Sequence, residues 1–449
     1  MKKLLNLILL FAGMIALSNV STGCSKDEPP VPDPEPPTPV LPTSPEWIDT
    51  KFAYVLQVCG YIPDAATVTK EEVAAIDTLI IPLWDSLEPY PDRYLTSLKG
   101  IEFFKGLECL KCGINRIEEL DLTSNTNLKY LDCDFNRLTT LNLSGLTELQ
   151  IVICDWNEGL ENLNLTDCRK LKTLNAWHNS LTSLDLSTNL ALETVDCRGG
   201  GDLQELKLPE GSQLRKIVAG SFGGESLYVP SSPHLAHLDC GGHNLSHLTV
   251  DDPSTITHLD ISYSKLDVEI LQEFPNLTEL HCIDMDWSQL DLSFNPRLES
   301  LHCYNSHLSN LDLSNNPLLD YADIHGNNLT QLDLSNNPLL YYADIHNNDL
   351  IQLDLSNNPI LHYADIHNND LTQLDISNLK QLTWLNVRQN RLQALDVRGL
   401  PWLETLLIQE NPGKDNIFQL ILGTDQEITI RPDSWVCGSG YVTTQWIRK

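Results

Sequence analysis

The sequence predicts a mainly β solenoid of about 14 short turns, and three observations support this fold class. A 21-residue segment, LDLSNNPLLDYADIHGNNLTQ at 311–331, recurs almost unchanged at 332–352 and at 353–373. Leucines continue the same frame from Leu120 to Leu395, with one degenerate turn between Leu248 and Leu290. Apolar and polar residues alternate with a period of two, and the 3.6-residue period of a helix is nearly absent.

Each turn is expected to contain two short strands, one on each side of the solenoid. In LKYLDCDFNRL, the side chains of Leu128, Leu131, Cys133 and Leu138 should point inward, and Asn136 should turn the chain. The half-turn LSNLDLSNNPL at 308–318 repeats this spacing. Two such segments fill the 21 residues and leave no room for a full helix.

The spacing L-x-x-L-x-L-x-x-N-x-L resembles the bacterial leucine-rich repeat family in its short, nested 21-residue form. The resemblance covers roughly residues 100–411. It implies a right-handed solenoid whose parallel strands present side chains that bind other molecules.

The chain is expected to divide into five parts: a lipoprotein signal peptide (1–23), a lipid anchor and proline-rich spacer (24–45), an N-terminal cap (46–100), the solenoid (101–411) and a β-rich C-terminal cap (412–449). Caps cover strand edges that would otherwise aggregate. In the N-terminal cap, FAYVLQVCG predicts a short helix that ends at Gly60. TKEEVAAIDTL predicts a second helix with Thr69 and Glu72 as a capping box.

The N-terminal segment MKKLLNLILLFAGMIALSNVSTGC has the basic start and apolar run of a secretion signal. STGC resembles a bacterial lipobox, which implies lipidation of Cys24, and the following SKDE resembles the export signal of Bacteroidetes-type surface lipoproteins. Residues 29–45 contain nine prolines in seventeen positions and predict an extended spacer of roughly 50 Å. The expected location is the outer membrane, lipid-anchored and exposed at the cell surface.

The cysteines favour packing over metal binding. Seven of the twelve fall at one inward position: Cys112, Cys133, Cys154, Cys197, Cys240, Cys282 and Cys303. Cysteine packs as a small hydrophobe in such a column, whereas zinc needs ligands that converge on one point. The pairing of Cys59, Cys168 and Cys437 cannot be deduced from the sequence.

A net charge of −32 argues against nucleic acid and anionic membrane surfaces as partners. Part of this charge forms a column of outward aspartates: Asp291, Asp312, Asp333, Asp354, Asp375 and Asp396. Neighbours about 4.8 Å apart repel by roughly 0.9 kcal/mol even in bulk water. Three compensations are open: hydrogen bonds from the serine column Ser293, Ser314, Ser335, Ser356 and Ser377, bound cations, or carboxylates that splay apart.

The three near-identical turns predict a three-by-three surface patch. A tyrosine, an aspartate and a histidine alternate with inward residues in each turn, so all three are expected to face solvent on one strand and to lie beside their copies. The candidate ligand-binding residues are Tyr321, Asp323, His325, Tyr342, Asp344, His346, Tyr363, Asp365, His367 and the flanking Trp384. Asn386 and Arg388 extend the patch on one side, and Ser300, His302 and Tyr304 on the other.

Aromatic and adaptable polar groups are typical of binding faces, although duplication of one repeat would also copy these residues without selecting them. A catalytic site is not expected, because a ladder of identical Asp and His residues singles out no nucleophile. No cofactor is expected, and no metal, because parallel side chains rarely converge. The sequence therefore predicts a monomeric surface recognition module that binds a protein ligand. A glycan-binding or structural envelope component that uses the same face is the alternative.

Overall fold

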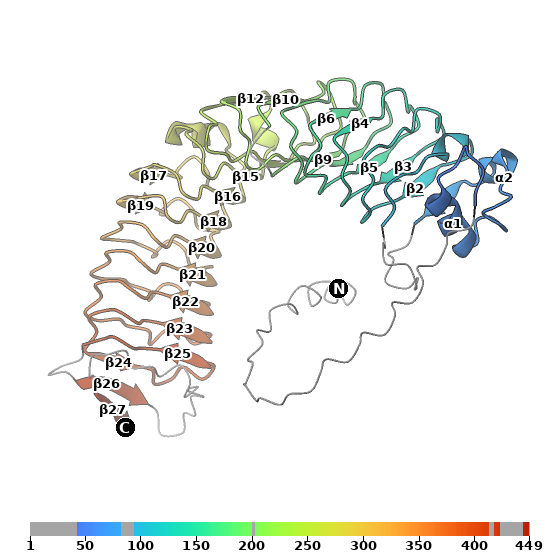
Figure 1. Ribbon diagram of the computed structural model, residues 1–449. Coiled ribbons are helices and arrows are strands. Elements are labelled where there is room, and N and C mark those ends of the chain that lie inside the picture. The colour runs from blue at the N-terminus through green and yellow to red at the C-terminus, as the bar shows by residue number, and fades with distance from the viewer. Residues whose placement is uncertain (1–42, 82–93, 200–202, 413–416, 423–442, 449) are drawn as a thin grey trace, which may run out of the picture. The chain divides into compact units, whose positions relative to one another are not determined.

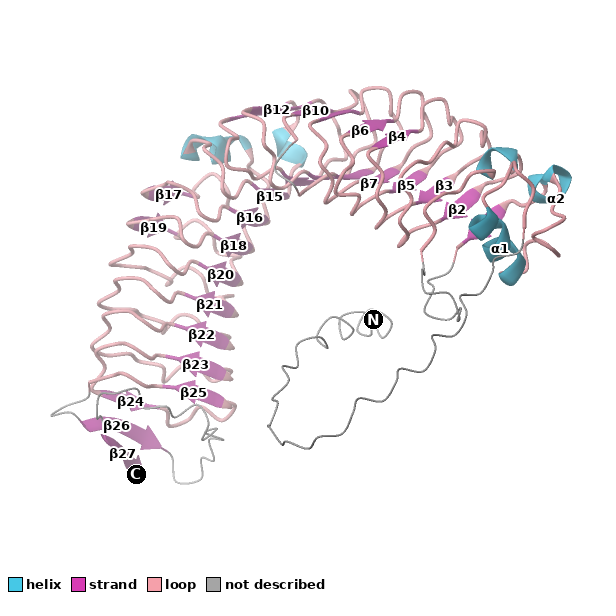
Figure 2. Ribbon diagram, in the orientation of Figure 1, coloured by secondary structure: helices cyan, strands magenta, loops and turns pink. Residues whose placement is uncertain are grey.

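The computed structural model describes residues 43–81, 94–199, 203–412, 417–422 and 443–448. Signal peptide, Cys24 and nearly all of the spacer lie outside this part of the chain, as does Cys437. Within it, the chain coils as a parallel β solenoid of short turns, with helices only at the N-terminal end and in the middle (Figure 1, Figure 2). The predicted fold class is confirmed. No helix of the described residues is long and apolar enough to span a membrane.

One side of every turn contributes a strand to a 16-stranded parallel sheet, the main sheet. Its strands are β1 (Thr78–Ile80), β2 (Cys109–Lys111), β3 (Tyr130–Asp132), β5 (Ile151–Ile153), β7 (Thr173–Asn175), β9 (Thr194–Asp196), β11 (Lys216–Val218), β13 (His237–Asp239), β15 (His258–Asp260), β16 (Glu279–His281), β18 (Ser300–His302), β20 (Tyr321–Asp323), β21 (Tyr342–Asp344), β22 (Tyr363–Asp365), β23 (Trp384–Asn386) and β25 (Thr405–Leu407). Each strand is three residues long, so it presents its first and third side chains on one face and buries its second.

The opposite side is less regular, because its strands pair only in small groups. These strands are β4 (Thr140–Asn142), β6 (Asn162–Asn164), β8 (Ser183–Asp185), β10 (Glu205–Lys207), β12 (Ser226–Val229), β14 (His247–Val250), β17 (Gln289–Asp291), β19 (Asn310–Asp312) and β24 (Ala394–Asp396). In the degenerate turn, the 3₁₀ helix η5 (Val268–Glu273) takes the place of such a strand. Two further 3₁₀ turns are η3 (Ile101–Phe103) and η4 (Pro253–Thr255).

The interior is a stack of leucine columns with a cysteine column beside them. All seven cysteines of the predicted column are buried with free thiols, and Cys168 is a further buried thiol that donates to the carbonyl of Leu143 at 3.2 Å. The thiols of this column are free, and burial raises the pKa of the Cys197 thiol to about 12. They pack as apolar groups, and the prediction of a packing role is confirmed.

Buried asparagines close the turns, as predicted for Asn136. Its Nδ2 donates to the carbonyls of Cys112 and Cys133 at 3.0 and 3.1 Å, and its Oδ1 accepts the Ile117 N–H at 2.9 Å. The same bonds recur at Asn348 and Asn390. Each asparagine thus supplies partners for backbone groups of two successive turns that water cannot reach.

The N-terminal cap contains the two expected helices, α1 (Thr50–Val58) and α2 (Lys70–Ala74). The capping box of α2 is present, with Thr69 and Glu72 each bonded to the backbone of the other. Gly60 follows α1 with a φ of +76°, a conformation that glycine adopts without cost. At the C-terminal end, β26 (Ile417–Leu422) pairs with β24 and with β27 (Thr443–Arg448).

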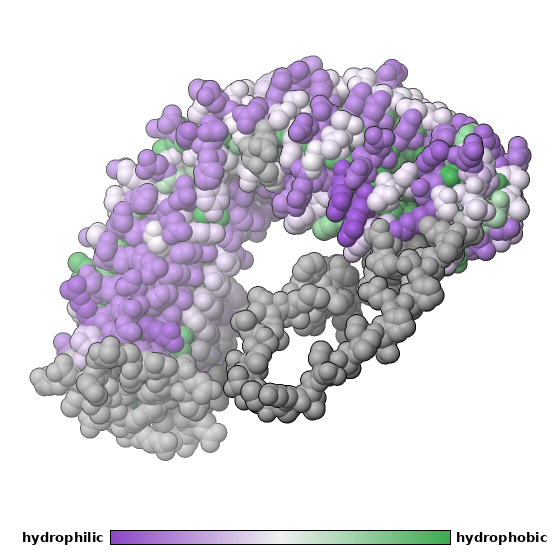
Figure 3. Space-filling view, viewed as in Figure 1, coloured by the Kyte–Doolittle hydropathy of each residue, from purple (hydrophilic) through white to green (hydrophobic). Residues whose placement is uncertain are grey.

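The aspartate column on the opposite side is compensated by the serine column. Five backbone N–H groups, from Ser293, Ser314, Ser335, Ser356 and Ser377, each donate to the aspartate two residues earlier at 2.8–2.9 Å. These serine hydrogen bonds hold the pKa of Asp333 below its usual value. At the end of the column, Arg398 pairs with Asp396 instead. The visible surface is predominantly hydrophilic (Figure 3).

Candidate functional site

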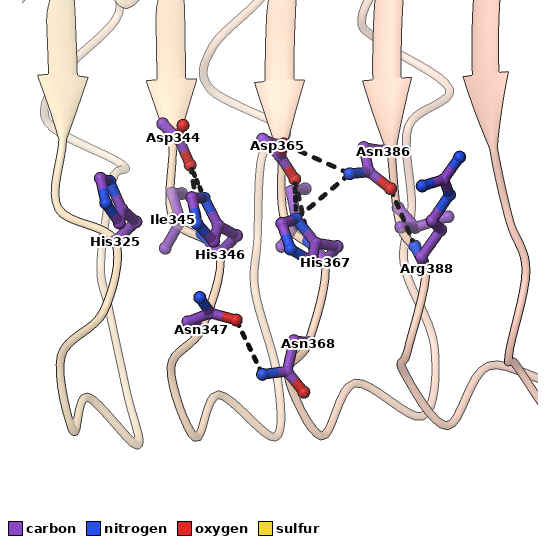
Figure 4. Close-up of polar contacts among 12 residues, drawn as sticks. His325, Asp344, Ile345, His346, Asn347, Asp365, His367, Asn368, Asn386 and Arg388 are labelled. Atoms are coloured by element: carbon purple, nitrogen blue, oxygen red, sulfur yellow. Dashed lines mark hydrogen bonds and ion pairs between the residues drawn. The ribbon is translucent and has the colours of Figure 1, made fainter. Parts of the chain in front are cut away.

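The ten predicted ligand-binding residues lie together on the exposed face of the main sheet, and we call them the Tyr–His patch: Tyr321, Asp323, His325, Tyr342, Asp344, His346, Tyr363, Asp365, His367 and Trp384. Strands β20, β21, β22 and β23 pair in parallel with no register shift, so Tyr321, Tyr342, Tyr363 and Trp384 are direct neighbours. The histidines lie just beyond the strand ends, two residues after each aspartate (Figure 4).

The aromatic side chains form one continuous stack. Ring centroids are 4.3 Å apart between Tyr321 and Tyr342 and between Tyr342 and Tyr363, and 4.2 Å apart between Tyr363 and Trp384. The planes deviate from parallel by only 3–6°. Equal side chains on adjacent strands adopt equal rotamers, so the strand spacing sets the ring spacing. The rings are half-buried and expose the edge of a flat apolar ladder.

The histidines form a second, parallel stack. His325, His346 and His367 have ring centroids 4.3 Å apart. Each Nδ1 is hydrogen-bonded to the aspartate two residues earlier: His325 to Asp323 at 2.5 Å, His367 to Asp365 at 2.6 Å, and His346 to Asp344 (Figure 4). An Asp–Nδ1 bond fixes the ring orientation and directs Nε2 outward. The histidines are therefore positioned donors or acceptors.

Two of the three aspartates of the patch do not face solvent as predicted. Asp344 and Asp365 are only 8% and 7% exposed. The tyrosine stack on one side and the histidine stack on the other cover the carboxylates, an effect that the alternation of residues along a single strand does not reveal. Each aspartate is hydrogen-bonded to the histidine two residues later and so orients that ring; a direct contact between the aspartates and a ligand stays a prediction.

The electrostatics of the patch follow from these contacts. Burial lowers the pKa of His325, but the hydrogen bond to Asp323 and the charges of Asp323 and Asp344 outweigh it, so the pKa is raised. For Asp365, burial raises the pKa, and the hydrogen bonds from His367 and Asn386 outweigh burial and lower it. Burial also raises the pKa of Tyr363 to about 12. The tyrosine hydroxyls therefore stay neutral and can donate hydrogen bonds at physiological pH.

Metal-ligand atoms approach one another more closely here than expected of parallel side chains. Ligand atoms of His325, Asp344 and His346 lie within 4.8 Å of one another, and so do those of His346, Asp365 and His367. The planes of the histidine rings are within 8–11° of parallel, however. A transition metal needs nitrogens that point at one centre from about 2.1 Å. The proximity of the ligand atoms alone does not provide such a centre, because each histidine Nδ1 is already hydrogen-bonded to an aspartate.

The patch continues beyond the predicted residues on both sides. His302 stacks on Tyr321 with centroids 4.7 Å apart, and Tyr304 stacks on His325 at 4.4 Å. On the far side, Asn386 donates to Asp365 Oδ2 at 3.2 Å, and the Arg388 guanidinium donates to Gln409 Oε1 at 2.6 Å. The sequence identified His302, Tyr304, Asn386 and Arg388 as flanking residues, and the contact of Gln409 was missed because its turn lies outside the identical repeats.

No protein-family model matches the chain, and neither does any curated protein. Among solved structures, it is similar to the functional domain of InlJ from Listeria monocytogenes, described as including a cysteine ladder, with a TM-score of 0.65 and 27% identity over 87% of this chain and 85% of that one. It is also similar to the leucine-rich repeat protein LIC12759 of Leptospira interrogans, with a TM-score of 0.50 and 19% identity over 81% of this chain and 93% of that one.

The fold is a leucine-rich repeat solenoid. This agrees with the family resemblance of the 21-residue period. A third similar structure, the Toll–Spatzle complex of Drosophila, has a TM-score of 0.52 and 16% identity over 80% of this chain and 52% of that one, and it supports the fold alone.

Proposed function

We propose that this leucine-rich repeat chain is a recognition module, and that its Tyr–His patch binds a protein ligand. One observation carries the proposal: four aromatic rings stack in register along the main sheet, beside a row of histidines that buried aspartates hold in place. Rigid aromatic side chains lose little entropy on binding and dominate protein interfaces. Similarity to bacterial leucine-rich repeat proteins supports a binding role in general.

A binding role fits the patch better than catalysis. Each of the three Asp–His pairs has the same local contacts, and no serine, cysteine or threonine nucleophile lies in the patch. Without a group whose environment differs from that of its copies, general acid and general base cannot be assigned to different residues.

The affinity of parent and variant proteins for a ligand tests whether the Tyr–His patch is the binding site. We expect Tyr342→Ala to weaken binding by about 2 kcal/mol or more, roughly 30-fold in Kd, because it removes the central ring. Full-length protein, immobilised, would be exposed to host and bacterial extracts and to a glycan array, and the captured molecule would then be titrated against parent and variant by calorimetry. Retention of a glycan and no protein would favour the glycan alternative on the same face.

Ser335→Ala is the matched control, because Ser335 lies in the same repeat on the opposite side, and its backbone N–H still bonds Asp333 after the change. We expect Ser335→Ala to bind as the parent does. Equal affinities for parent, Tyr342→Ala and Ser335→Ala would contradict a role of the patch and leave it as a consequence of duplication.

We also propose that the module is displayed on the outer membrane by a lipid on Cys24. Support comes from the lipobox-like STGC, the following SKDE and the proline-rich spacer, all in the sequence. Cys24→Ala should release the protein from the membrane fraction, and protease added to intact cells should remove the parent. Intact parent protein recovered free in the periplasm would contradict this proposal.

A further inference from the structure

A group of polar side chains lies on the main sheet directly before the Tyr–His patch, on strands β15, β16 and β18, the last of which pairs with β20. These strands pair in parallel without a register shift. Their first and third positions face outward and carry six residues: His258, Asp260, Glu279, His281, Ser300 and His302. Unlike the copied turns of the patch, each of these strands presents a different pair of side chains.

The carboxylate of Glu279 lies at the centre of this group. His281 Nε2 donates to Glu279 Oε1 at 2.9 Å, and His258 Nε2 lies 3.4 Å from the other oxygen, Oε2. Ligand atoms of Glu279, His281 and His302 all lie within 4.8 Å of one another, and we call these three residues the Glu–His cluster. One carboxylate and two imidazoles thus approach a common point from two columns of the sheet.

The distances within the Glu–His cluster are close to those around a bound zinc ion. Zinc binds imidazole nitrogen and carboxylate oxygen at about 2.0–2.2 Å, so ligand atoms of a tetrahedral site lie about 3.4 Å apart. The distance of 2.9 Å between Glu279 Oε1 and His281 Nε2 is only about 0.5 Å shorter. Both side chains are partly exposed, at 38% and 28%, so small rotations can supply the difference.

Ring stacking leaves the nitrogen lone pairs of the two histidines available. His302 stacks between His281 and Tyr321, with ring centroids 4.1 and 4.7 Å apart. Stacked neighbours cover the faces of a ring, whereas the lone pair of an imidazole nitrogen lies in the ring plane and points outward from the ring edge. His302 Nε2 lies 3.3 Å from the Ser300 hydroxyl, and His281 Nε2 contacts Glu279. Both Nε2 atoms therefore point toward the column of first strand positions.

The Tyr–His patch differs in these respects, although its ligand atoms are equally close. Asp365 is 7% exposed and is fixed by hydrogen bonds from His367 Nδ1, the His367 N–H and Asn386. Glu279 is more exposed, and a glutamate side chain is longer by one rotatable bond, so its carboxylate can follow an ion. The planes of His281 and His302 are also inclined by 29°, compared with 8–11° in the patch.

We propose that Glu279, His281 and His302 bind one Zn²⁺ ion, with water at the fourth position. The ion replaces the proton between His281 Nε2 and Glu279, and this proton moves to His281 Nδ1, which lies 3.9 Å from Asp260 Oδ2. A carboxylate near the outer nitrogen favours this tautomer in a metal-binding histidine. Two imidazoles and one carboxylate favour zinc over calcium and magnesium, which prefer oxygen ligands.

The sequence predicted no metal because copied side chains are parallel, and that reason does not apply to ligands from two different columns. The zinc site is also separate from the proposed protein-binding role, so either one can fail without the other.

Calorimetric titration of the metal-free full chain with Zn²⁺ tests the site. We expect one ion to bind with a Kd below about 10 μM. His302→Gln and Glu279→Gln should each weaken this binding by at least about tenfold, because even loss of an outer partner of a metal ligand costs about 10- to 100-fold. Thermal unfolding with zinc and with a chelator is the second readout: zinc should raise the Tm of the parent more than that of either variant.

His247→Gln is the matched control, because it removes an exposed imidazole from β14, on the opposite side of the same region; it should bind zinc as the parent does. His346→Gln locates the ion, since His346 belongs to both candidate clusters of the Tyr–His patch. A parent Kd weaker than about 10 μM, parental affinity in His302→Gln or Glu279→Gln, or loss of zinc in His346→Gln would overturn the proposal.

Discussion

The two aromatic clusters of this solenoid are built in opposite ways. In the Tyr–His patch, identical rings stack at 4.2–4.3 Å on strands whose backbone is extended. A second cluster lies nearer the N-terminus: Phe135, Trp156 and His178 occupy left-handed backbone positions, and their ring centroids are 5.1 Å apart between Phe135 and Trp156 and 3.8 Å apart between Trp156 and His178. Both clusters expose aromatic surface on the same repeated scaffold.

The difference shows what each cluster implies about selection. Duplication of one repeat places identical rings side by side on strands whose backbone is unstrained. The ring stack of the Tyr–His patch therefore does not by itself show whether these residues were selected for function or only copied. Duplication cannot explain Ile114, Phe135 and Trp156, because three different residues share one unfavourable conformation. The N-terminal cluster therefore has the stronger structural signal, and the Tyr–His patch has the larger and more ordered surface.

The largest effect on the free energy of unfolding is expected at the buried asparagines, a feature that both regions of the solenoid share. Asn136→Ala and Asn348→Ala should each lower the free energy of unfolding by about 3 kcal/mol, because each leaves several buried backbone groups without a partner. Chemical unfolding would measure both. Asn328→Ala removes one exposed hydrogen bond and is the control. An Asn348→Ala protein as stable as the control would contradict the shared scaffold.

A reciprocal exchange between two positions with left-handed backbone isolates the backbone cost. Ile114 and Asn305 both have a φ of 54° and both are exposed. Ile114→Asn should raise the free energy of unfolding by about 1 kcal/mol, and Asn305→Ile should lower it by a similar amount. Thermal unfolding of both variants gives the comparison. A lower stability of Ile114→Asn would show that Ile114 is held by packing and not strained.

A smaller difference between the two regions is expected in how the free energy of unfolding changes with pH. Burial, followed by the charges of Asp132 and Asp155, raises the pKa of Asp134 to about 7. Folding thus favours its protonated form, and stability is lost as pH rises from about 4, the unfolded value, to about 7. The raised pKa of His325 likewise favours the protonated histidine. Its contribution is complete below about 6.5 and is lost as pH rises through the folded value.

The parent should lose stability as pH rises from 4.5 to 7, and Asp134→Asn should not show this loss. Similarly, the loss that the parent shows above pH 6.5 should be smaller in His325→Gln. Each effect should be about 1 kcal/mol or less, because both groups are partly exposed and screened. Unfolding curves at pH 4.5, 6.5 and 8.5 test this in parent and variants. If parent and His325→Gln show the same change between pH 6.5 and 8.5, the Asp323 contact does not stabilise the charged histidine.

The sequence predicted the fold because the interior of a solenoid repeats with the period of its turns. Leu128, Cys133 and Asn136 were assigned correctly from spacing alone, whereas hydrogen bonds from the serines to the aspartate column were only one of three alternatives that the spacing left open. Burial of Asp344 and Asp365 was not predicted, since it arises from rings on neighbouring columns and not from alternation within a strand. The ring stack that includes Phe135 was also missed, because the φ of a turn residue does not follow from its type.

Contacts between residues that are distant in the sequence could be predicted only where the repeat places them at the same position of adjacent turns. The stack from Tyr321 to Trp384 followed from the 21-residue offset, whereas the Glu–His cluster depends on side chains of two turns that are not copies of one another. Lipidation of Cys24 and display on the outer membrane stay predictions, because that segment lies outside the described residues.

The central claim is that the Tyr–His patch binds a protein ligand, and its most direct test is the ratio of two dissociation constants. Calorimetric titration of the captured protein against parent and Tyr342→Ala should give a Kd about 30-fold weaker for the variant. Thermal unfolding should be nearly unchanged, because Tyr342 is half-exposed. A ratio near one, with both proteins folded, would contradict the account.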